Sequence, residues 1–511
     1  MKQHSCTQEA SSNEWEALTH EFMDLYRQGS YDRAAAVAKK ALDVAEQNFG
    51  PYHPAVATSL TSLAEVYRAQ RDYIKAVLLY NRVLDIVENA YGPTHPNVAI
   101  ILNDVADLHR VQGDYAKAEP PYKRSLDIRE DALGSNHPDV ATSLNNLAEL
   151  YRTQGDYAKA EPLHKRSLAI REKILGSDHP AVATSLSNLA LLYQTQGDYV
   201  KAEPLHKHSL DILEEVLGPN HPNVAVGLNN LGALYENQGD YIKAEPLYTR
   251  SLDIREKTLG SDHPDVATAL NNLAGLHRAQ GDYTSARSLY VRSVDILEKA
   301  LGPNHPNVAN GLNNLADLYR VQGDYTEARP LYTRSLGIWE NTLGSDHPNV
   351  AKGQGKLADI YRAQGDYDKA EPIYKRSADI LEKALGPDHP DVATGLNNLA
   401  DLYRAQGYYA MAKPFYERSL EIWEKALGPD HPNMATGLNN LGALYEDQGD
   451  HSKAEPLYKR SLAIREKALG SNHPDVATSL NNLALLYRAT KRTKDAEELE
   501  RRAAEIRLME R

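Results

Sequence analysis

The chain has 511 residues, of which 41% are hydrophobic and 25% are charged, and its net charge is −13. This acidic balance argues against a general nucleic-acid binder, whose surface carries a basic excess. The single cysteine, Cys6, excludes an intrachain disulfide and a cysteine-based zinc site. No run of about 18 apolar residues could span a bilayer, and the N-terminus lacks the apolar stretch of a signal peptide. We therefore expect a cytoplasmic protein that binds no membrane.

The N-terminal part of the chain is irregular. Residues 1–12 are polar, and we expect them to be disordered. Residues 13–50 predict a helical hairpin that reads LYRQGSY where later copies read LYRTQGDY. We interpret this hairpin as a cap, because the end faces of a repeat array have no neighbour to cover them.

From residue 51 to residue 490 the chain repeats a single unit of 42 residues. Each unit carries one His-Pro pair, with the histidine at 53, 95, 137, 179, 221, 263, 305, 347, 389, 431 and 473. A repeat array can grow without a single large core, since each unit packs only on its neighbours. Residues 491–511 are highly charged and predict a C-terminal capping helix.

Every unit predicts two helices. In the copy at 137–178 the first spans about Pro138–Gln154, because proline suits the first helical position and apolar residues recur at i, i+3, i+4 and i+7. After a Gly-Asp turn, the second spans about Tyr157–Leu175. Pro162 lies inside this second helix and should bend its first turn or delay its start.

The repeated histidines could indicate a metal or a structural joint. A shared metal needs ligand nitrogens about 2 Å from one ion, whereas neighbouring helix axes lie about 8–10 Å apart. Each histidine also precedes a proline, where the helical conformation is disfavoured. We therefore interpret each histidine as the N-cap-like residue of a structural corner that packs on or bonds to an adjoining helix end, with no metal bound.

No motif in the chain indicates catalysis. The sequence contains no GxxxxGK[ST], no GxSxG and no HExxH, and nearly every polar residue recurs from unit to unit. A catalytic site needs an acid, a base or a nucleophile that converge at one place. We expect no catalytic residue and no cofactor.

The spacing of Leu144, Leu147, Ala148 and Tyr151, followed by a tight Gly-Asp turn, resembles the tetratricopeptide repeat, a hairpin of about 34 residues. The longer unit, with NNLA, GDYxKAEPLYKRSL, IREK and LGxDHPDVA, resembles the repeat of kinesin light chains. This resemblance covers about residues 13–510. It implies an all-α fold, a right-handed superhelical solenoid of about twelve antiparallel hairpins.

A polar face of the first helix carries recurring asparagines, and the resemblance places this face on the concave side. The candidate peptide-binding asparagines are Asn145, Asn146, Asn188, Asn229, Asn230, Asn271, Asn272, Asn313, Asn314, Asn397, Asn398, Asn439 and Asn440. An amide both donates and accepts hydrogen bonds, so a ladder of amides could hold an extended peptide backbone. The alternative is that the amides bond to neighbouring helices.

An arginine stripe follows the same face. Its candidate ligand contacts are Arg152, Arg278, Arg320, Arg362 and Arg404. Arginine suits bidentate recognition of carboxylates, which favours an acidic partner. The alternative is an intrahelical pair with an acid three residues earlier, such as Asp317. The recurring tyrosines, such as Tyr248, are interpreted as packing residues with a solvated hydroxyl.

The array breaks once, where KGQGKLA replaces the usual GLNNLA. Two glycines inside a predicted helix each cost about 0.5–1 kcal/mol relative to alanine. Residues 352–356 are therefore a candidate hinge, and drift in one tolerated copy is the alternative.

The sequence as a whole predicts a non-catalytic scaffold that binds an extended peptide or partner protein in a concave groove. We expect a monomer, with self-association left open. Three alternatives remain: a kinesin light chain-like cargo adaptor of a microtubule motor, a regulatory module acting in trans on an enzyme, and a self-assembling structural role through stacked repeats.

Overall fold

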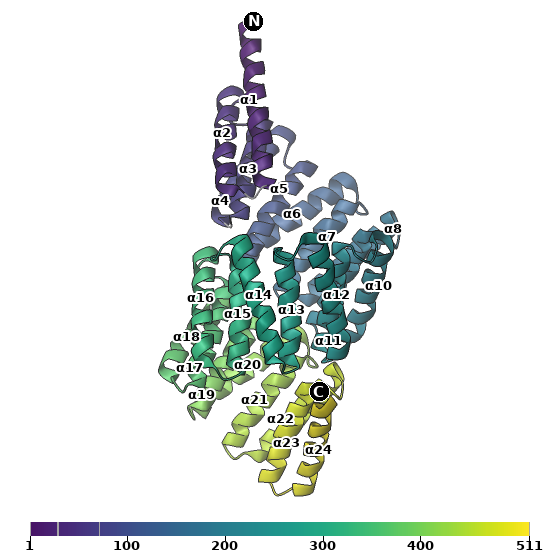
Figure 1. Ribbon diagram of the computed structural model, residues 1–511, viewed down its shortest axis with the longest axis vertical. Helices are drawn as coiled ribbons and strands as arrows, with labels where there is room; N and C mark the ends of the chain where they lie inside the picture. Colours follow the sequence, from purple (N-terminus) through teal and green to yellow (C-terminus); the bar gives the residue numbers. More distant parts are fainter. Residues whose placement is uncertain (1, 28–29, 71, 510–511) are drawn as a thin grey trace. The chain divides into compact units, whose positions relative to one another are not determined.

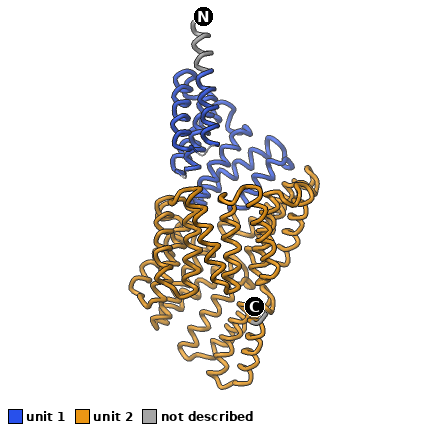
Figure 2. The backbone as a smooth tube through the Cα atoms, viewed as in Figure 1, with its two compact units in different colours: residues 1–150 blue, residues 151–511 orange. Residues whose placement is uncertain are grey.

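The computed structural model describes residues 2–27, 30–70 and 72–509, and within these ranges it consists of helices, turns and loops. The described chain forms 24 α-helices paired into hairpins (Figure 1). It divides into two compact units, residues 1–150 and residues 151–511 (Figure 2). The all-α class and the array of helical hairpins are confirmed.

The first unit contains α1 (Lys2–Arg27), α2 (Tyr31–Phe49), α3 (Pro54–Ala69), α4 (Tyr73–Tyr91), α5 (Pro96–Val111) and α6 (Tyr115–Leu133). The boundary between the units falls near the end of α7 (Pro138–Thr153). The second unit continues with α8 (Tyr157–Leu175), α9 (Pro180–Thr195), α10 (Tyr199–Leu217), α11 (Pro222–Asn237), α12 (Tyr241–Leu259), α13 (Pro264–Ala279), α14 (Tyr283–Leu301), α15 (Pro306–Val321) and α16 (Tyr325–Leu343). It ends with α17 (Pro348–Ala363), α18 (Tyr367–Leu385), α19 (Pro390–Ala405), α20 (Tyr409–Leu427), α21 (Pro432–Asp447), α22 (His451–Leu469), α23 (Pro474–Ala489) and α24 (Thr493–Met509).

The repeated histidines start the first helix of each repeat. In all eleven copies the imidazole Nδ1 accepts the backbone N–H two residues on, as from Ala55 to His53 at 3.1 Å. This bond satisfies one of the amides that an α-helix leaves unpaired at its N-terminus. The predicted structural corner is confirmed, and we call each His-Pro pair a corner.

The turn between the two helices of a hairpin follows from its Gly-Asp sequence. Gly155 has a φ of 75°, a left-handed conformation that glycine adopts without steric cost. The Asp156 carboxylate then accepts the backbone N–H of Lys159 at 3.2 Å and caps α8. Although Pro162 lies inside α8, the helix starts at Tyr157 as expected and is not delayed.

Each hairpin buries small residues between its helices. In the hairpin of α9 and α10, Ala190 and Ala202 are fully buried, and the buried Ser209 hydroxyl donates to the Ala183 carbonyl at 2.8 Å. The equivalent serines make the same bond in five further hairpins, at Ser125, Ser251, Ser293, Ser377 and Ser461. This recurring serine of the second helix is therefore a packing element, because it ties the second helix to the first.

Repeats far apart in the sequence touch within the second unit. The Nε2 of His389 lies 2.8 Å from the Thr153 carbonyl oxygen, and that of His431 lies 3.1 Å from the Thr195 carbonyl oxygen. His473 forms the corresponding hydrogen bond with the backbone of Asn237. Each partner lies 236 residues earlier, at the end of a first helix, so successive superhelical turns of this unit stack on one another.

The glycine turn makes room for this stacking. A Cβ at Gly155 would lie 2.7 Å from the Pro390 Cδ, and one at Gly197 would lie 3.0 Å from the Pro432 Cδ. We call each meeting of a corner with a turn a corner–turn contact. Because Nδ1 accepts the cap bond, the neutral imidazole must carry its proton on Nε2, which donates to the carbonyl.

The candidate hinge at 352–356 lies inside α17, which is helical throughout. A Cβ at Gly353 would lie 2.9 Å from the Trp339 ring, so this glycine makes room for a large neighbour. Lys356 forms an ion pair with Asp317 on α15. The irregular sequence thus has a packing role, and hinge motion stays a prediction.

The terminal expectations keep their status. Residue 1 and residues 510–511 lie outside the described residues, as do the side chains of residues 2–12, although α1 begins at Lys2. Disorder of residues 1–12 stays a prediction, and so do the capping roles of residues 13–50 and 491–511.

We predict that the corner–turn contacts stabilise the second unit. The triple variant H389N, H431N and H473N keeps a cap acceptor at each helix start but cannot reach the distant carbonyl. Each substitution therefore removes one hydrogen bond, worth about 1 kcal/mol. Differential scanning calorimetry at low protein concentration should show a lower melting temperature than for the wild type.

The matched control changes three corners whose histidines cap a helix but do not take part in a corner–turn contact. It carries H179N, H221N and H263N. This variant should melt close to the wild type, and equal melting temperatures for the two triple variants would contradict the stabilising role.

The same three histidines predict a pH dependence. Burial lowers the pKa of His389, His431 and His473 in the folded chain, whereas an unfolded imidazole has a pKa of about 6.5. As the pH falls from about 7 to about 5, the unfolded chain binds protons that the folded chain resists, so stability decreases. The melting temperature should fall less steeply over this interval in the triple variant of these histidines than in the wild type, and parallel slopes would refute this prediction.

Candidate functional site

The asparagines of successive first helices bond to one another. Asn272 Nδ2 donates to Asn229 Oδ1 at 2.5 Å, and Asn440 Nδ2 donates to Asn397 Oδ1 at 3.3 Å. Asn482 does the same with Asn439 at 2.9 Å. At these positions the second asparagine of one repeat donates a hydrogen bond to the first asparagine of the preceding repeat. The alternative interpretation, bonding between neighbouring helices, therefore describes part of the ladder.

The remaining candidate asparagines differ in their surroundings. Asn271 Nδ2 donates to the Ser293 hydroxyl at 2.7 Å within its own hairpin. Asn313 is buried and lies 3.5 Å from Asp317. Half-buried side chains on the same columns are Asn145, Asn146, Asn188, Asn230, Asn314 and Asn398. A ligand-binding role for any of these asparagines stays a prediction.

The arginine stripe faces carboxylates of the chain itself. Arg320 Nε lies 3.5 Å from Asp317, and Arg362 lies 3.6 Å from Asp359 on the same helix. Arg404 instead reaches Asp447 of the next repeat at 3.3 Å. Intrahelical pairing, the alternative stated for this stripe, therefore holds at Arg320 and Arg362.

Two further arginines complete the candidate stripe. Arg152 also has an interaction partner within the chain. The residue three positions before Arg278 is Gly275 instead of an acid. The Arg278 side chain lies beside the Tyr290 hydroxyl. Ligand contacts by either arginine stay a prediction.

The tyrosines of the second helices complete this network. The hydroxyl of Tyr332 donates to Asp317 at 2.5 Å, and that of Tyr248 donates to Glu236 at 2.7 Å. Both rings are buried. The solvated hydroxyl expected for Tyr248 is therefore wrong: the hydroxyl bonds to a carboxylate, because a buried O–H needs an acceptor. Glu236 stands at the stripe position that arginine occupies in other repeats, and its carboxylate accepts the hydrogen bond of the Tyr248 hydroxyl.

The charges around equivalent carboxylates differ along the array. Burial opposes ionisation of Asp317, but Lys356, Tyr332 and Arg320 together hold its pKa below the ordinary value. Burial raises the pKa of the equivalent Asp401, because no lysine stands beside it to offset the desolvation. The charged carboxylate therefore stabilises the fold at Asp317 and destabilises it at Asp401, although the two residues occupy equivalent repeat positions.

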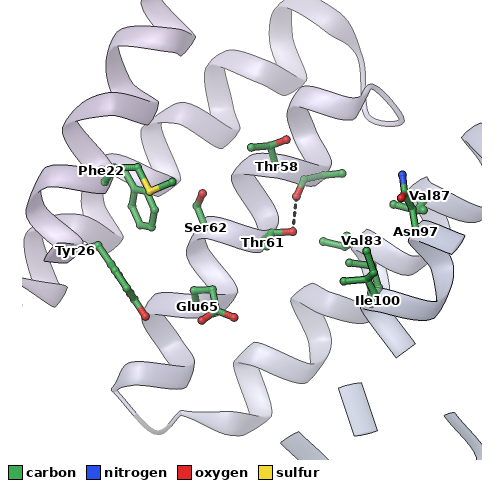
Figure 3. Close-up of a pocket in the computed structure, with 13 residues that line it drawn as sticks. Phe22, Tyr26, Thr58, Thr61, Ser62, Glu65, Val83, Val87, Asn97 and Ile100 are labelled. Atoms are coloured by element: carbon green, nitrogen blue, oxygen red, sulfur yellow. Dashed lines mark hydrogen bonds between the residues drawn. The ribbon is translucent and has the colours of Figure 1, made fainter. Parts of the chain in front are cut away.

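An apolar pocket lies between consecutive first helices of the first unit (Figure 3). Its volume is about 440 Å³. Phe22 and Tyr26 of α1 lie on one side, Thr61 of α3 lies in the middle, and Ile100 of α5 lies on the other side. Glu65 is the one ionisable carboxylate among its lining residues. The pocket can therefore take an apolar side chain of a ligand.

The second unit has an equivalent pocket between α9 and α11, with a volume of about 340 Å³. Nine of its twelve lining residues occupy the same repeat positions as residues of the first pocket, three repeats later. Asn188 and Asn230 of the candidate ladder line it together with Val226. This pocket is more polar, because the amides stand where the first unit carries shorter hydroxyl side chains or an acid.

Sequence reasoning missed both pockets, although one column carries a signal for them. Ile100 and Val226 are 50% and 49% exposed. They stand in a column that most repeats fill with threonine, as in VATSL and VATGL. An exposed β-branched hydrocarbon in an otherwise polar column marks a place where apolar surface is kept open to solvent.

We predict that removing the charge of Asp317 costs more stability than the same change at Asp401. The lowered pKa of Asp317 means that its charged form stabilises the fold above the ordinary carboxyl pKa, and this stability is lost as pH falls through the folded pKa. At neutral pH, D317N should lower the free energy of unfolding by up to about 3 kcal/mol, because Lys356 loses its partner.

The matched variant is D401N, whose side chain can still accept the bond from Tyr416. It relieves a desolvated charge and should cost less. Urea denaturation of both variants measures the difference, and a larger loss for D401N would disprove the electrostatic assignment.

The described part of the chain contains neither a metal site nor a membrane-spanning helix. No group of three or more His, Cys, Asp or Glu side chains there could hold a metal ion. No described helix combines the length and the apolar character that crossing a membrane requires.

Comparison with known proteins places the chain among repeat proteins. A search of curated proteins found no match. A crystal structure described as that of a kinesin light chain of Podosopora anserina with nearly identical TPR-like repeats is 30% identical over 40% of this chain and 98% of its own, with a TM-score of 0.34. BtubC (BKLC) from P. vanneervenii is 24% identical over 46% of this chain and 92% of its own, with a TM-score of 0.36.

A third solved structure shares the fold over a longer stretch. The Rap protein complexed with Competence and Sporulation Factor is 14% identical and covers 73% of this chain and all of its own, with a TM-score of 0.50. The tetratricopeptide repeat profile matches residues 23–89, 63–131, 97–173, 139–215, 182–257, 223–299, 265–320, 307–383, 350–420, 391–467 and 434–509. Because these matches follow one another along nearly the whole chain, the protein belongs to the tetratricopeptide repeat family.

Proposed function

We propose that the protein is a non-catalytic scaffold that binds extended polypeptide segments along the polar face of its first helices. The observation that carries this proposal is the pocket between α9 and α11, where Asn188 and Asn230 flank the exposed Val226. An apolar side chain of a ligand enters the pocket, and the amides bond the ligand backbone beside it.

The pocket of the first unit supports the same mode of binding. Its walls are mostly apolar, with Phe22 and Ile100 on opposite sides, so it accepts a bulky aliphatic or aromatic side chain. A wholly apolar site would bind without orientation, whereas the Thr58 and Thr61 hydroxyls, which donate to carbonyls of their own helix, still accept a hydrogen bond that orients a ligand. Each unit thus carries its own anchor pocket.

The arginine stripe contributes less to this proposal than the pockets do. Arg320 and Arg362 lie next to carboxylates of their own helices, and a ligand carboxylate would have to compete with these groups. Preference for an acidic partner and a monomeric state at low concentration stay predictions. Cytoplasmic location likewise stays a prediction.

We predict that V226E weakens ligand binding by the second unit without unfolding it. Peptides are first selected from a random library on the immobilised wild-type chain, and their affinities are then measured by isothermal titration calorimetry. A buried carboxylate in the pocket should weaken peptides that use this site by at least about tenfold, since it is desolvated by the bound side chain.

The control is V200E, because Val200 is 85% exposed on the second helix α10 and lines neither pocket. It should bind like the wild type. The variant I100E tests the first unit in the same way. If neither V226E nor I100E weakens any selected peptide, the proposed site is wrong.

A further inference from the structure

The corner–turn contact has two halves, and nine of the eleven repeats carry both, since Arg71 and Lys491 stand at the glycine position of the other two. One half is the corner, whose imidazole Nε2 donates to a carbonyl. The other is the turn after the first helix, which offers that carbonyl and a glycine over which the proline packs. Because the repeats are nearly identical, a contact formed by one pair of repeats is chemically available to any other pair at the same spacing.

In the second unit several turns have no corner above them. A Cβ at Gly281, Gly323, Gly365, Gly407 or Gly449 would meet nothing within 4 Å. By contrast, the three turns already engaged, at Gly155, Gly197 and Gly239, lie directly against a corner. Val321 is exposed beside the open turn at Gly323, whereas the equivalent Thr153 and Thr195 are half-buried beside engaged turns. The later turns therefore form an open edge of carbonyls and apolar surface.

The opposite edge of the same unit presents open corners. The side chain of His263 is 42% exposed, whereas that of the engaged His389 is 8% exposed. His179 is exposed and His221 is half-buried. In each of these corners Nδ1 accepts the cap bond, which directs the neutral Nε2–H outward as in the engaged histidines.

We propose that the open corners at His179, His221 and His263 of one molecule dock on three successive open turns of a second copy of this chain. The interface continues the corner–turn contacts that the second unit already makes within itself. Successive corners and successive turns both recur every 42 residues, so three corners of one copy meet three turns of the other in register. The contact joins different surfaces of the two copies and is heterologous, so it can extend from dimers to longer head-to-tail assemblies.

A second copy fits these edges better than an unrelated partner. The open turns require donors that recur once per repeat along a curved edge, together with a proline that packs over each glycine. The corners of this chain supply both features at that spacing, and they are exposed in the same unit. An unrelated ligand could bind at a single open turn, but it would not present a donor and a proline to several successive turns.

Sedimentation velocity of the full chain tests this proposal. Over about two decades of concentration, the average mass of the wild type should rise above the 56.8 kDa of one chain. The variant H179N, H221N and H263N retains its helix caps and should stay monomeric with unchanged melting. A second variant, G323N, G365N and G407N, covers the open turns, and asparagine tolerates their positive φ.

Mixing the two variants separates this interface from every other mode of association. Each variant keeps one intact edge, so an equimolar mixture should form heterodimers and nothing larger. A monomeric wild type at every concentration would overturn the proposal, and so would self-association of either variant alone. Neither result would affect the peptide-binding proposal, because the substituted residues line neither pocket.

Discussion

Every repeat of this chain depends on one hydrogen bond, in which the imidazole of the corner accepts a backbone N–H at the start of the first helix. This bond fixes where the helix begins and leaves Nε2 as an outward donor. At three corners, His389, His431 and His473, the same side chain also contacts a carbonyl 236 residues away, where the superhelix returns to it. A local cap and a long-range contact are thus two uses of one imidazole, and both require its neutral form.

Much of the local structure could be predicted from the residues themselves. Proline after histidine, glycine before aspartate and the apolar spacing determine the helix bounds to within one residue, as α7 and α8 illustrate. These signals act over a few residues, so a single sequence is enough to interpret them. The stacking of corner on turn could not be predicted, because it depends on small rotations that accumulate over more than five repeats before two of them meet.

The candidate site was less accessible to such reasoning. The asparagine columns were identified, but Asn229 and Asn272 use each other as partners, and nothing in the sequence distinguishes that from binding a ligand. The carboxylates that approach the arginines could be anticipated from a spacing of three residues. The pockets could have been found from Ile100 and Val226, since these residues break a column of threonines. The tyrosine hydroxyls were misjudged because their acceptors lie on the other helix of the hairpin.

We propose that the polar faces of the first helices hold the ligand, while the second helices serve to pack the array. Hydrogen–deuterium exchange of the wild-type chain, with and without a saturating library-selected peptide, tests this claim most directly. This proposal predicts slower exchange in α3 and α5, or in α9 and α11, with the second helices that line neither pocket, such as α12 and α14, unchanged. Protection confined to second helices such as α10 and α12 would contradict it.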